Sequence, residues 1–245
     1  MAFIDRVMNG FFVIKGLGLY LRPGVWLGFL KNPSQFFANY LSLTKWISQN
    51  NNRNVMNDFL VPTRVRGVRN EYYKYIVDKY NLQNNAVTYL EFGVYKGDSM
   101  RWWIDVNKNT ASFFGGFDTF EGLPESWGPY AKGAMKADMP DIKDERLLFV
   151  KGLFQDTLYK FMEQNKSRLQ QKLIINLDAD LFSATIFVLS TLAPFLKKDD
   201  IIMFDEFNVP NHEFYAFKIF TESFPIKLEM IAARLNFYHV AFKVL

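Results

Sequence analysis

Four acidic residues follow two strand-like runs in the second half of the chain. Asp178 and Asp180 end the run LDAD, and Asp205 and Glu206 lie in the run FDEF. If both runs are parallel strands of one sheet, their carboxyl ends meet at one edge, where open α/β sheets bind ligands. Carboxylates in one cleft repel each other unless a cation compensates them, and an all-oxygen ligand set suits Mg²⁺. The alternative is that these acids cap strand ends and lie in water at the rim.

A loop with two glycines suggests a second kind of chemistry. The apolar run at 86–92 breaks at Gly93 and Gly97, which predicts a buried strand that enters a tight loop. A second strand, at 112–117, leads into Asp118. Glycines after a strand let a ligand approach the backbone, and an acid after the next strand accepts hydrogen bonds from ribose hydroxyls. A nucleotide-like ligand fits this pattern, although two glycines alone also fit an ordinary tight turn.

The composition excludes several other kinds of site. The 245 residues include no cysteine and only two histidines, His212 and His239. Disulfides, thiolate nucleophiles, Cys-ligated metals and a histidine-rich metal centre are therefore excluded, and any metal must be held largely by oxygen. The lack of cysteine leaves the compartment open, because proteins of either redox environment can lack it. With 49% hydrophobic residues, the chain can bury a sizeable core.

The elements that must position these residues alternate between strand and helix. Such alternation is typical of a doubly wound α/β fold with a parallel sheet. At the C-terminal end, two strand-like runs have only a short connection, so we expect them to pair antiparallel at the sheet edge, since parallel neighbours need a long crossover. The predicted strands are 86–92, 112–117, 147–151, 172–177, 201–204, 227–232 and 237–244, and the predicted helices are 70–80, 99–106, 157–169, 183–196 and 213–223.

The first third of the chain has a different character. Residues 1–80 carry eleven Lys or Arg and four Asp or Glu, a net charge of +7, whereas residues 81–245 carry −3. Ten aromatic residues lie in the first fifty. The polar stretch 48–58 predicts a loop. We therefore divide the chain into a basic, aromatic-rich helical extension at 1–80 and an α/β domain at 81–245.

Several interpretations of the first fifty residues stay open. Short helices here would cap the core, act as a lid or form a contact between copies of the chain, and we expect a homo-oligomer. Aromatic and basic side chains together also favour the headgroup region of an anionic membrane. Nucleic acid is not expected as a partner, because the aromatic residues lie among apolar neighbours instead of in a basic stripe. No uncharged run in the first thirty residues approaches the ~20 apolar residues of a membrane-crossing helix, and Asp5 and Lys15 interrupt any signal peptide.

Five runs in the second part of the chain occur in a recognisable order. They are EFGVYKGDS at 91–99, GFDTFEGLPESW at 116–127, KGLFQDTL at 151–158, LDADLFSAT at 177–185 and FDEF at 204–207. Together they resemble the macrocin O-methyltransferase family, class I S-adenosylmethionine-dependent enzymes that methylate sugar hydroxyls in natural products. The first and third runs also resemble loops of catechol O-methyltransferase, a more distant relative with metal-dependent chemistry. Both resemblances imply a Rossmann-like sheet of seven strands with a reversed last strand.

The resemblance implies a site for S-adenosylmethionine. The loop after the first strand is expected to hold the methionine end, Asp118 the ribose hydroxyls, and the loop after the third strand the adenine, where an apolar side chain covers the purine and a polar one meets its edge. Alternatively, Glu91 caps loop amides and Phe154 belongs to the core. The expected cofactor-binding residues are Glu91, Gly93, Tyr95, Gly97, Ser99, Asp118, Phe154, Gln155, Asp156 and Asp178.

The resemblance also assigns a metal. Asp178, Asp205 and Glu206 are the implied ligands of a divalent cation, and Mg²⁺ is the expected ion. The family usually carries a second Asp where this chain has Glu206. The extra methylene moves that carboxylate outward and changes the geometry that it offers to a metal.

Methyl transfer to an oxygen needs a group that removes the hydroxyl proton. A bound metal lowers the pKa of a coordinated hydroxyl, and a nearby carboxylate takes the proton. Asp180, two residues beyond Asp178, is the expected base, and His212, after the fifth strand, is the alternative. His239, on the last strand, is expected to be structural.

The sequence therefore predicts a metal-assisted O-methyltransferase that uses S-adenosylmethionine to methylate a hydroxyl of a sugar or glycosylated natural product. We expect it in the cytoplasm, with peripheral membrane contact through residues 1–50 as one interpretation. Two alternatives stay open: a phenolic or lipid-linked glycan acceptor, and a non-catalytic protein that binds adenosylmethionine. The acceptor is not predicted, because residues 1–85 and 121–141, from which the lid and pocket are expected, match no motif.

Overall fold

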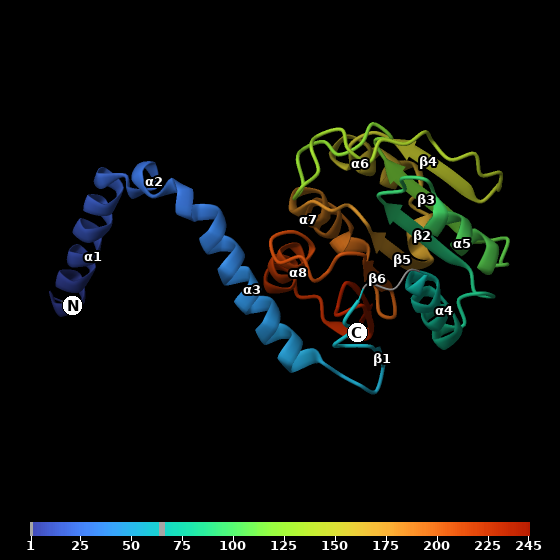
Figure 1. Ribbon diagram of the computed structural model, residues 1–245, viewed down its shortest axis with the longest axis horizontal. Helices are drawn as coiled ribbons and strands as arrows, with labels where there is room; N and C mark the ends of the chain where they lie inside the picture. Colours follow the sequence, from blue (N-terminus) through green and yellow to red (C-terminus); the bar gives the residue numbers. More distant parts are fainter. Residues whose placement is uncertain (1, 64–66) are drawn as a thin grey trace.

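An eight-stranded sheet lies at the centre of the computed structural model, which describes residues 2–63 and 67–245 (Figure 1). The strand order is β1-β7-β8-β6-β5-β2-β3-β4. β8 is antiparallel to both of its neighbours, β6 and β7, whereas the other neighbouring strands pair in parallel. The strands are β1 (Met56–Asn57), β2 (Val87–Phe92), β3 (Phe113–Asp118), β4 (Leu147–Lys151), β5 (Lys172–Leu177), β6 (Ile201–Phe204), β7 (Leu228–Arg234) and β8 (His239–Val244).

Seven of these strands form the doubly wound sheet that the sequence predicts, and the reversed last strand is confirmed. β8 enters between β6 and β7, so β7 lies outside it. The eighth strand, β1, pairs with the outer edge of β7 inside a stretch that is predicted to be a loop. A strand of two residues has no alternation of apolar and polar side chains, so no pattern in the sequence indicates it.

Helices cover both faces of the sheet. α4 and α5 bury their side chains in one hydrophobic cluster, and α6, α7 and α8 bury theirs in another. All six residues of β2 are buried, as expected for a parallel strand with helices on both sides. The helices of this part are α4 (Val68–Tyr80), α5 (Asp98–Val106), α6 (Phe154–Gln164), α7 (Phe182–Leu192) and α8 (Glu213–Ser223), with 3₁₀ turns η2 (Arg168–Gln170) and η3 (Ala193–Phe195).

Helix α4 packs as part of this domain although it lies before residue 81. It begins after Gly67 and ends at Tyr80, and the left-handed backbone of Asn81 stops the helix there. Tyr72, Tyr73 and Ile76 are fully buried and contribute to the cluster shared with α5. The packed unit therefore includes part of the range predicted as an extension, of which residues 1 and 64–66 lie outside the described residues.

The first helices form an arm. α1 (Ala2–Leu21), α2 (Pro23–Trp26) and η1 (Gly28–Leu30) precede the long helix α3 (Lys31–Asn50). Figure 1 shows α1 and α2 at the far end of α3, away from the sheet. We call residues 2–37 the arm, because no side chain described there is buried. Within residues 2–63 and 67–245, no helix has the length and apolarity needed to cross a bilayer.

The second half of α3 attaches the arm to the domain. The Trp46 ring lies 5.0 Å from the ring of Phe207 and 5.5 Å from that of Phe217, measured between centroids. Leu43 is buried, and Asn39 Nδ2 donates a 2.9 Å hydrogen bond to Asn211 Oδ1. This half of α3 is therefore part of the domain's core, whereas the arm is not.

Candidate active site

A large cavity lies at the carboxyl ends of the parallel strands. Its volume is about 710 Å³, and residues that follow β2, β3, β4, β5 and β6 line it. This is the edge at which open α/β sheets bind ligands, and residues predicted for both chemistries lie there. The predicted site residues that line it are Glu91, Gly93, Tyr95, Ser99, Asp118, Phe154, Gln155, Asp178, Asp180, Asp205 and Glu206.

The loop between β2 and α5 depends on its two glycines. Gly93 has φ +98°, and a Cβ there would lie 1.8 Å from the carbonyl oxygen of Asp178. Gly97 has φ +76° and precedes α5, and a Cβ there would lie 2.8 Å from Cγ of Pro140. Gly97 thus shapes the turn, as predicted, without lining the cavity. Only glycine allows the loop to pass this close to the end of β5.

Asp118 holds that loop in place. Its Oδ2 accepts hydrogen bonds of 2.8 Å from the backbone amides of both Val94 and Tyr95, and its Oδ1 accepts one of 2.8 Å from the amide of Phe120. A carboxylate has about four acceptor positions, so three amides leave capacity for a ligand hydroxyl. Asp118 can therefore order the loop and bind a ribose at once.

Glu91 is buried at the end of β2. The Tyr89 hydroxyl donates a 3.2 Å hydrogen bond to its Oε2. Burial raises the pKa of Glu91 to about 8, more than this hydrogen bond and the Arg69 guanidinium lower it. Below that pH, Glu91 presents a neutral carboxyl to the cavity.

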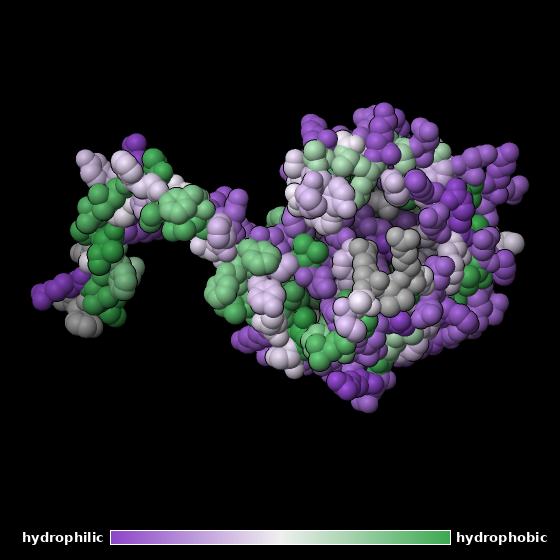
Figure 2. Space-filling view, in the orientation of Figure 1, coloured by the Kyte–Doolittle hydropathy of each residue, from purple (hydrophilic) through white to green (hydrophobic). Residues whose placement is uncertain are grey.

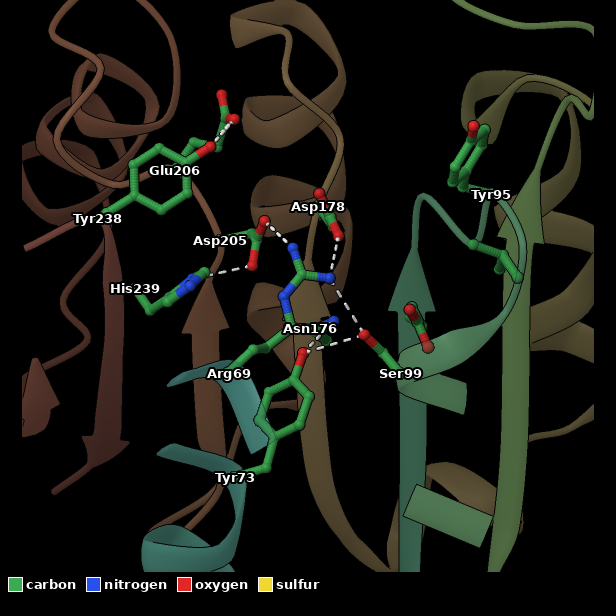
Figure 3. A network of polar contacts seen from close by, with 12 residues as sticks. Arg69, Tyr73, Tyr95, Ser99, Asn176, Asp178, Asp205, Glu206, Tyr238 and His239 are labelled. Carbon is green, nitrogen blue, oxygen red and sulfur yellow. Dashed lines mark hydrogen bonds and ion pairs between the residues drawn. The ribbon is translucent and has the colours of Figure 1, made fainter. Parts of the chain in front are cut away.

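An arginine that the sequence did not indicate holds together the acidic edge of the cavity. This edge consists of Asp178, Asp180, Asp205 and Glu206. Figure 3 shows the Arg69 guanidinium between Asp205 and Asp178, with Ser99 beside it. Nη2 donates to Asp205 Oδ2, while Nη1 lies 3.3 Å from Asp178 Oδ2 and donates a 3.3 Å hydrogen bond to Ser99 Oγ. On its other side, Asp205 Oδ1 lies 2.9 Å from His239 Nδ1. The two carboxylates at the ends of β5 and β6 thus share one protein cation.

The two carboxylates have different surroundings, and their pKa values shift in opposite directions. Burial alone would raise the pKa of Asp205, but the contact with His239 and the charge of Arg69 together hold it below its ordinary value. Burial and the neighbouring charge of Asp205 raise the pKa of Asp178 well above its ordinary value. Asp205 is therefore the carboxylate that stays ionised beside Arg69.

The predicted Mg²⁺ ligands do not assemble a metal site in this arrangement. Within the described part of the chain, no group of three or more acidic or histidine side chains is placed to hold a metal ion. Arg69 engages one oxygen each of Asp178 and Asp205, and Glu206 Oε1 accepts a hydrogen bond from the Tyr238 hydroxyl. A guanidinium where a divalent cation would sit repels that cation, so the residues as arranged do not fit Mg²⁺.

Asp180, the predicted base, lines the same cavity. Its backbone is left-handed, with φ 58°, in the turn between β5 and α7. Burial raises the pKa of Asp180 to about 7, and the charges of Glu206 and Asp205 act in the same direction. A carboxylate with this pKa can accept a proton near neutral pH.

The two histidines lie at the expected positions in the chain, after β6 and on β8, but their surroundings differ. His212 precedes α8 and is not among the residues that line the cavity, and its ring lies 6.4 Å from that of Trp127. Burial lowers the pKa of His212. His239 contacts Asp205 and so supports the acidic edge directly, while its ring stacks on Tyr72 at 5.8 Å.

The predicted adenine-binding residues begin α6. Phe154 and Gln155 line the cavity, and the Phe154 ring packs edge-on to Phe92 at 5.3 Å. Asp156 is exposed in the same helical turn but does not line the cavity. Its predicted contact with the cofactor therefore has no support from its position.

Several residues of the site carried no signal in the sequence. Arg69 immediately precedes the predicted helix 70–80 and looks like any other base of residues 1–80. Tyr73, one turn further, has its hydroxyl 3.3 Å from Ser99 Oγ. Glu213 is fully buried, and its Oε2 accepts a 2.8 Å hydrogen bond from the backbone amide of Glu206. The contacts of Arg69 and Tyr73 join residues far apart in the chain, so local patterns do not indicate them.

Comparison with known proteins identifies the fold. No protein-family model matches the chain, and no curated protein matches it in sequence. The calicheamicin methyltransferase CalS11 has 18% sequence identity and a TM-score of 0.53, with 84% of this chain and 91% of that chain covered. The O-methyltransferase NovP has 18% identity and a TM-score of 0.52, with 71% and 76% covered. The chain is similar to these enzymes in fold, which confirms the Rossmann-like methyltransferase fold that the resemblance implies.

Proposed function

We propose that this chain is an S-adenosylmethionine-dependent O-methyltransferase that acts on a hydroxyl of a sugar or glycosylated natural product. The observation that carries the proposal is that one cavity contains both the glycine loop with Asp118 and the acidic edge with Asp180. The first half suits a nucleoside cofactor and the second a proton acceptor. The names of the two solved structures, a calicheamicin methyltransferase and an O-methyltransferase, support the same reaction class.

Asp180 has the central role in the proposed reaction. The acceptor oxygen attacks the methyl carbon of the sulfonium, the bond between that carbon and sulfur breaks, and S-adenosylhomocysteine leaves. The proton of the acceptor hydroxyl goes to the Asp180 carboxylate. Because its pKa is about 7, Asp180 is ionised often enough to act and basic enough to take the proton.

The cofactor would lie along the loop between β2 and α5. Asp118 would accept hydrogen bonds from the ribose hydroxyls, and the ring of Phe154 would cover the adenine while Gln155 meets its edge. Glu91 and Ser99 would border the methionine end. No step in this scheme passes through a metal, because Arg69 lies between the carboxylates that would hold one.

Two other functions are worth testing beside this one. A lipid-linked glycan acceptor is favoured by the exposed apolar arm described above, and a phenolic acceptor by the resemblance to catechol O-methyltransferase. A non-catalytic protein would bind the cofactor without transferring its methyl group, and it would not use Asp180 as a base.

Calorimetry with S-adenosylhomocysteine tests the cofactor site. Wild-type chain should bind it, and Asp118→Ala should bind about 100-fold more weakly, because hydrogen bonds to a charged group contribute about 1.5–3 kcal/mol each. Asp105→Ala is the control, since Asp105 is exposed on α5 and distant from the cavity lining. Equal affinities for wild type and Asp118→Ala would overturn the ribose assignment, and no binding by wild type would overturn the proposal.

Transfer of a radiolabelled methyl group to a panel of glycosides and phenols tests the chemistry. With an accepted substrate, Asp180→Asn should lower kcat by roughly 10²–10⁴-fold. The wild-type rate should rise with pH and level off above about 7, because Asp180 must be ionised to accept a proton. His212→Gln should keep the wild-type rate, since His212 does not line the cavity. A flat pH profile, or loss of activity in His212→Gln with Asp180→Asn active, would reassign the base.

A further inference from the structure

A protein cation occupies the centre of the acidic edge. Arg69 contacts Asp178, Asp205 and Ser99, which come from β5, β6 and α5 (Figure 3). The guanidinium of an arginine keeps its proton in proteins at any ordinary pH. The guanidinium is therefore a permanent positive charge in the position between the two strand ends.

Two further oxygens of this edge also face protein groups. Asp205 Oδ1 faces His239 Nδ1 at 2.9 Å, and Glu206 Oε1 accepts from the Tyr238 hydroxyl. A divalent cation would have to displace Arg69 and reorganise these contacts. Displacing Arg69 would separate it from its two carboxylate partners, and this cost would reduce the net affinity for a metal.

We propose that Arg69 is the resident cation of this site and takes the place that the sequence resemblance assigns to a divalent metal. It is a positioning residue: it holds Asp178 and Asp205 together and keeps the carboxylates of the edge compatible with one another. The proposal deepens the proposed function, because it makes the transferase independent of metal. The assignment of the cation itself can be tested without knowing the acceptor.

Binding of Mn²⁺, followed by electron paramagnetic resonance on the full chain with S-adenosylhomocysteine present, is the direct test. Wild type should take up no Mn²⁺ at this edge. Arg69→Gln removes the charge and keeps a hydrogen-bonding group, and it should bind one Mn²⁺ per chain at least tenfold more tightly than wild type. The double variant Arg69→Gln with Asp205→Asn should lose that ion.

Two results would overturn the proposal. One is a single Mn²⁺ bound by wild type and lost in Asp205→Asn, which would show that Arg69 gives way to a metal. The other is a folded Arg69→Gln chain that binds no Mn²⁺, which would show that the guanidinium holds no cation position. If Arg69→Gln does not fold, as judged by circular dichroism, wild type and Asp205→Asn still decide. Failure of wild type to bind S-adenosylhomocysteine would count against the proposed function alone.

The arm supports a second and independent inference. Its described side chains include Phe11, Phe12, Trp26 and Phe29, which are 65%, 78%, 77% and 73% exposed. Figure 2 shows these helices as a largely apolar surface away from the domain. Isolated exposed apolar residues are common on proteins, but a contiguous surface of this kind indicates an interaction site.

The distribution of these side chains distinguishes the kinds of partner. Residues 11–14 of α1 read FFVI, and all four are exposed. Consecutive residues of a helix point about 100° apart, so four of them cover the whole circumference. A protein groove or a twofold contact covers one side of a helix, whereas lipid can surround it.

The charge of the arm complements an anionic surface. Residues 2–37 contain four Lys or Arg and one Asp, a net charge of +3. Two such arms would repel each other, whereas anionic headgroups attract the basic side chains of each arm. Tryptophan and phenylalanine next to basic residues suit the boundary between headgroups and acyl chains.

We infer that the arm inserts into the headgroup region of an anionic membrane and attaches the domain to it. Flotation of the full chain with vesicles is the test. Wild type should float with vesicles that contain phosphatidylglycerol, and much less with pure phosphatidylcholine or at high salt. The triple variant Phe11→Ser, Phe12→Ser, Trp26→Ser should remain in solution, while Tyr159→Ser, a similar change at an exposed ring of the domain, should float as wild type.

Wild type that stays in solution with both kinds of vesicle would overturn this inference. Light scattering in lipid-free buffer gives the competing outcome. A mass of two chains that the triple variant reduces to one would assign the arm to an interface between copies.

Discussion

Two tryptophans on neighbouring helices show how differently the arm and the domain use the same residue. Trp46 packs among Phe207, Phe217 and Phe242, with ring centroids 5.0–5.8 Å away. Trp26 is 77% exposed. Both occur in the same aromatic-rich, basic segment. They differ in that Trp46 packs against the domain, whereas Trp26 does not. The domain is thus completed by the second half of α3, and the arm adds nothing to its core.

The same substitution in both regions should show this difference most strongly. Trp46→Ala should lower the free energy of unfolding by about 3–5 kcal/mol, because it leaves a cavity among packed aromatic rings. Trp26→Ala should change it by less than about 0.5 kcal/mol, as for surface positions generally. Urea denaturation followed by circular dichroism measures both. Equal losses would mean that the arm is part of the cooperative unit.

Glycines extend the comparison to the backbone. Gly93→Ala should cost about 1–3 kcal/mol and weaken binding of S-adenosylhomocysteine, because its φ is +98° and the new Cβ would meet Asp178. Gly16→Ala, in α1, should be neutral or slightly favourable to the helix, since nothing lies within 4 Å of its Cβ position. Thermal unfolding and calorimetry test the pair. A Gly93→Ala chain with wild-type stability and affinity would remove the argument that close approach requires glycine here.

Most of the domain was predictable because buried strands appear in the sequence as local apolar runs. β2 and β5 are covered on both faces, so they appear in the sequence as apolar runs, and Asp178 and Asp205 at strand ends indicate one shared edge. β1 left no trace because it has two residues. The tail pair was predictable from its short connection, which forbids a parallel crossover.

The partners of the acidic edge were not predictable for a different reason. Arg69 is 109 residues before Asp178 in the chain and reaches it only because α4 packs on the sheet. Repulsion among the acids correctly indicates that a cation is needed, and the lack of cysteine restricts the choice among metals. Neither observation distinguishes Mg²⁺ from a guanidinium supplied by the chain itself.

The two regions also differ in where their charged side chains lie. The domain buries acidic side chains such as Glu91, whereas the Lys and Arg side chains of the arm are exposed. Burial raises the pKa of Glu91 from 4.5 to about 8, so the folded state holds its proton more tightly than the unfolded state. The stability from this group is complete below about pH 4.5 and is lost as the pH rises through about 8.

Glu91→Gln should therefore match wild type near pH 4.5 and exceed its stability by about 4–5 kcal/mol above pH 8, because the amide stays neutral. Urea midpoints across this pH range measure the difference. Glu145→Gln, at an exposed position, is the control and should show no such trend. A constant difference between Glu91→Gln and wild type at all pH values would mean that Glu91 does not change its protonation on folding.

The smallest effect should come from the largest change to the chain. Deleting residues 1–37 removes the arm but keeps Trp46 and Leu43, so the free energy of unfolding should change by less than about 0.5 kcal/mol and the affinity for S-adenosylhomocysteine should stay within about twofold. Deleting residues 1–50 removes those anchors as well and should cost stability on the scale of Trp46→Ala. Calorimetry and urea denaturation on both truncated chains test this division. If the shorter deletion weakened cofactor binding tenfold, the arm would have to reach the cavity in solution, and the separation of the two regions would fail.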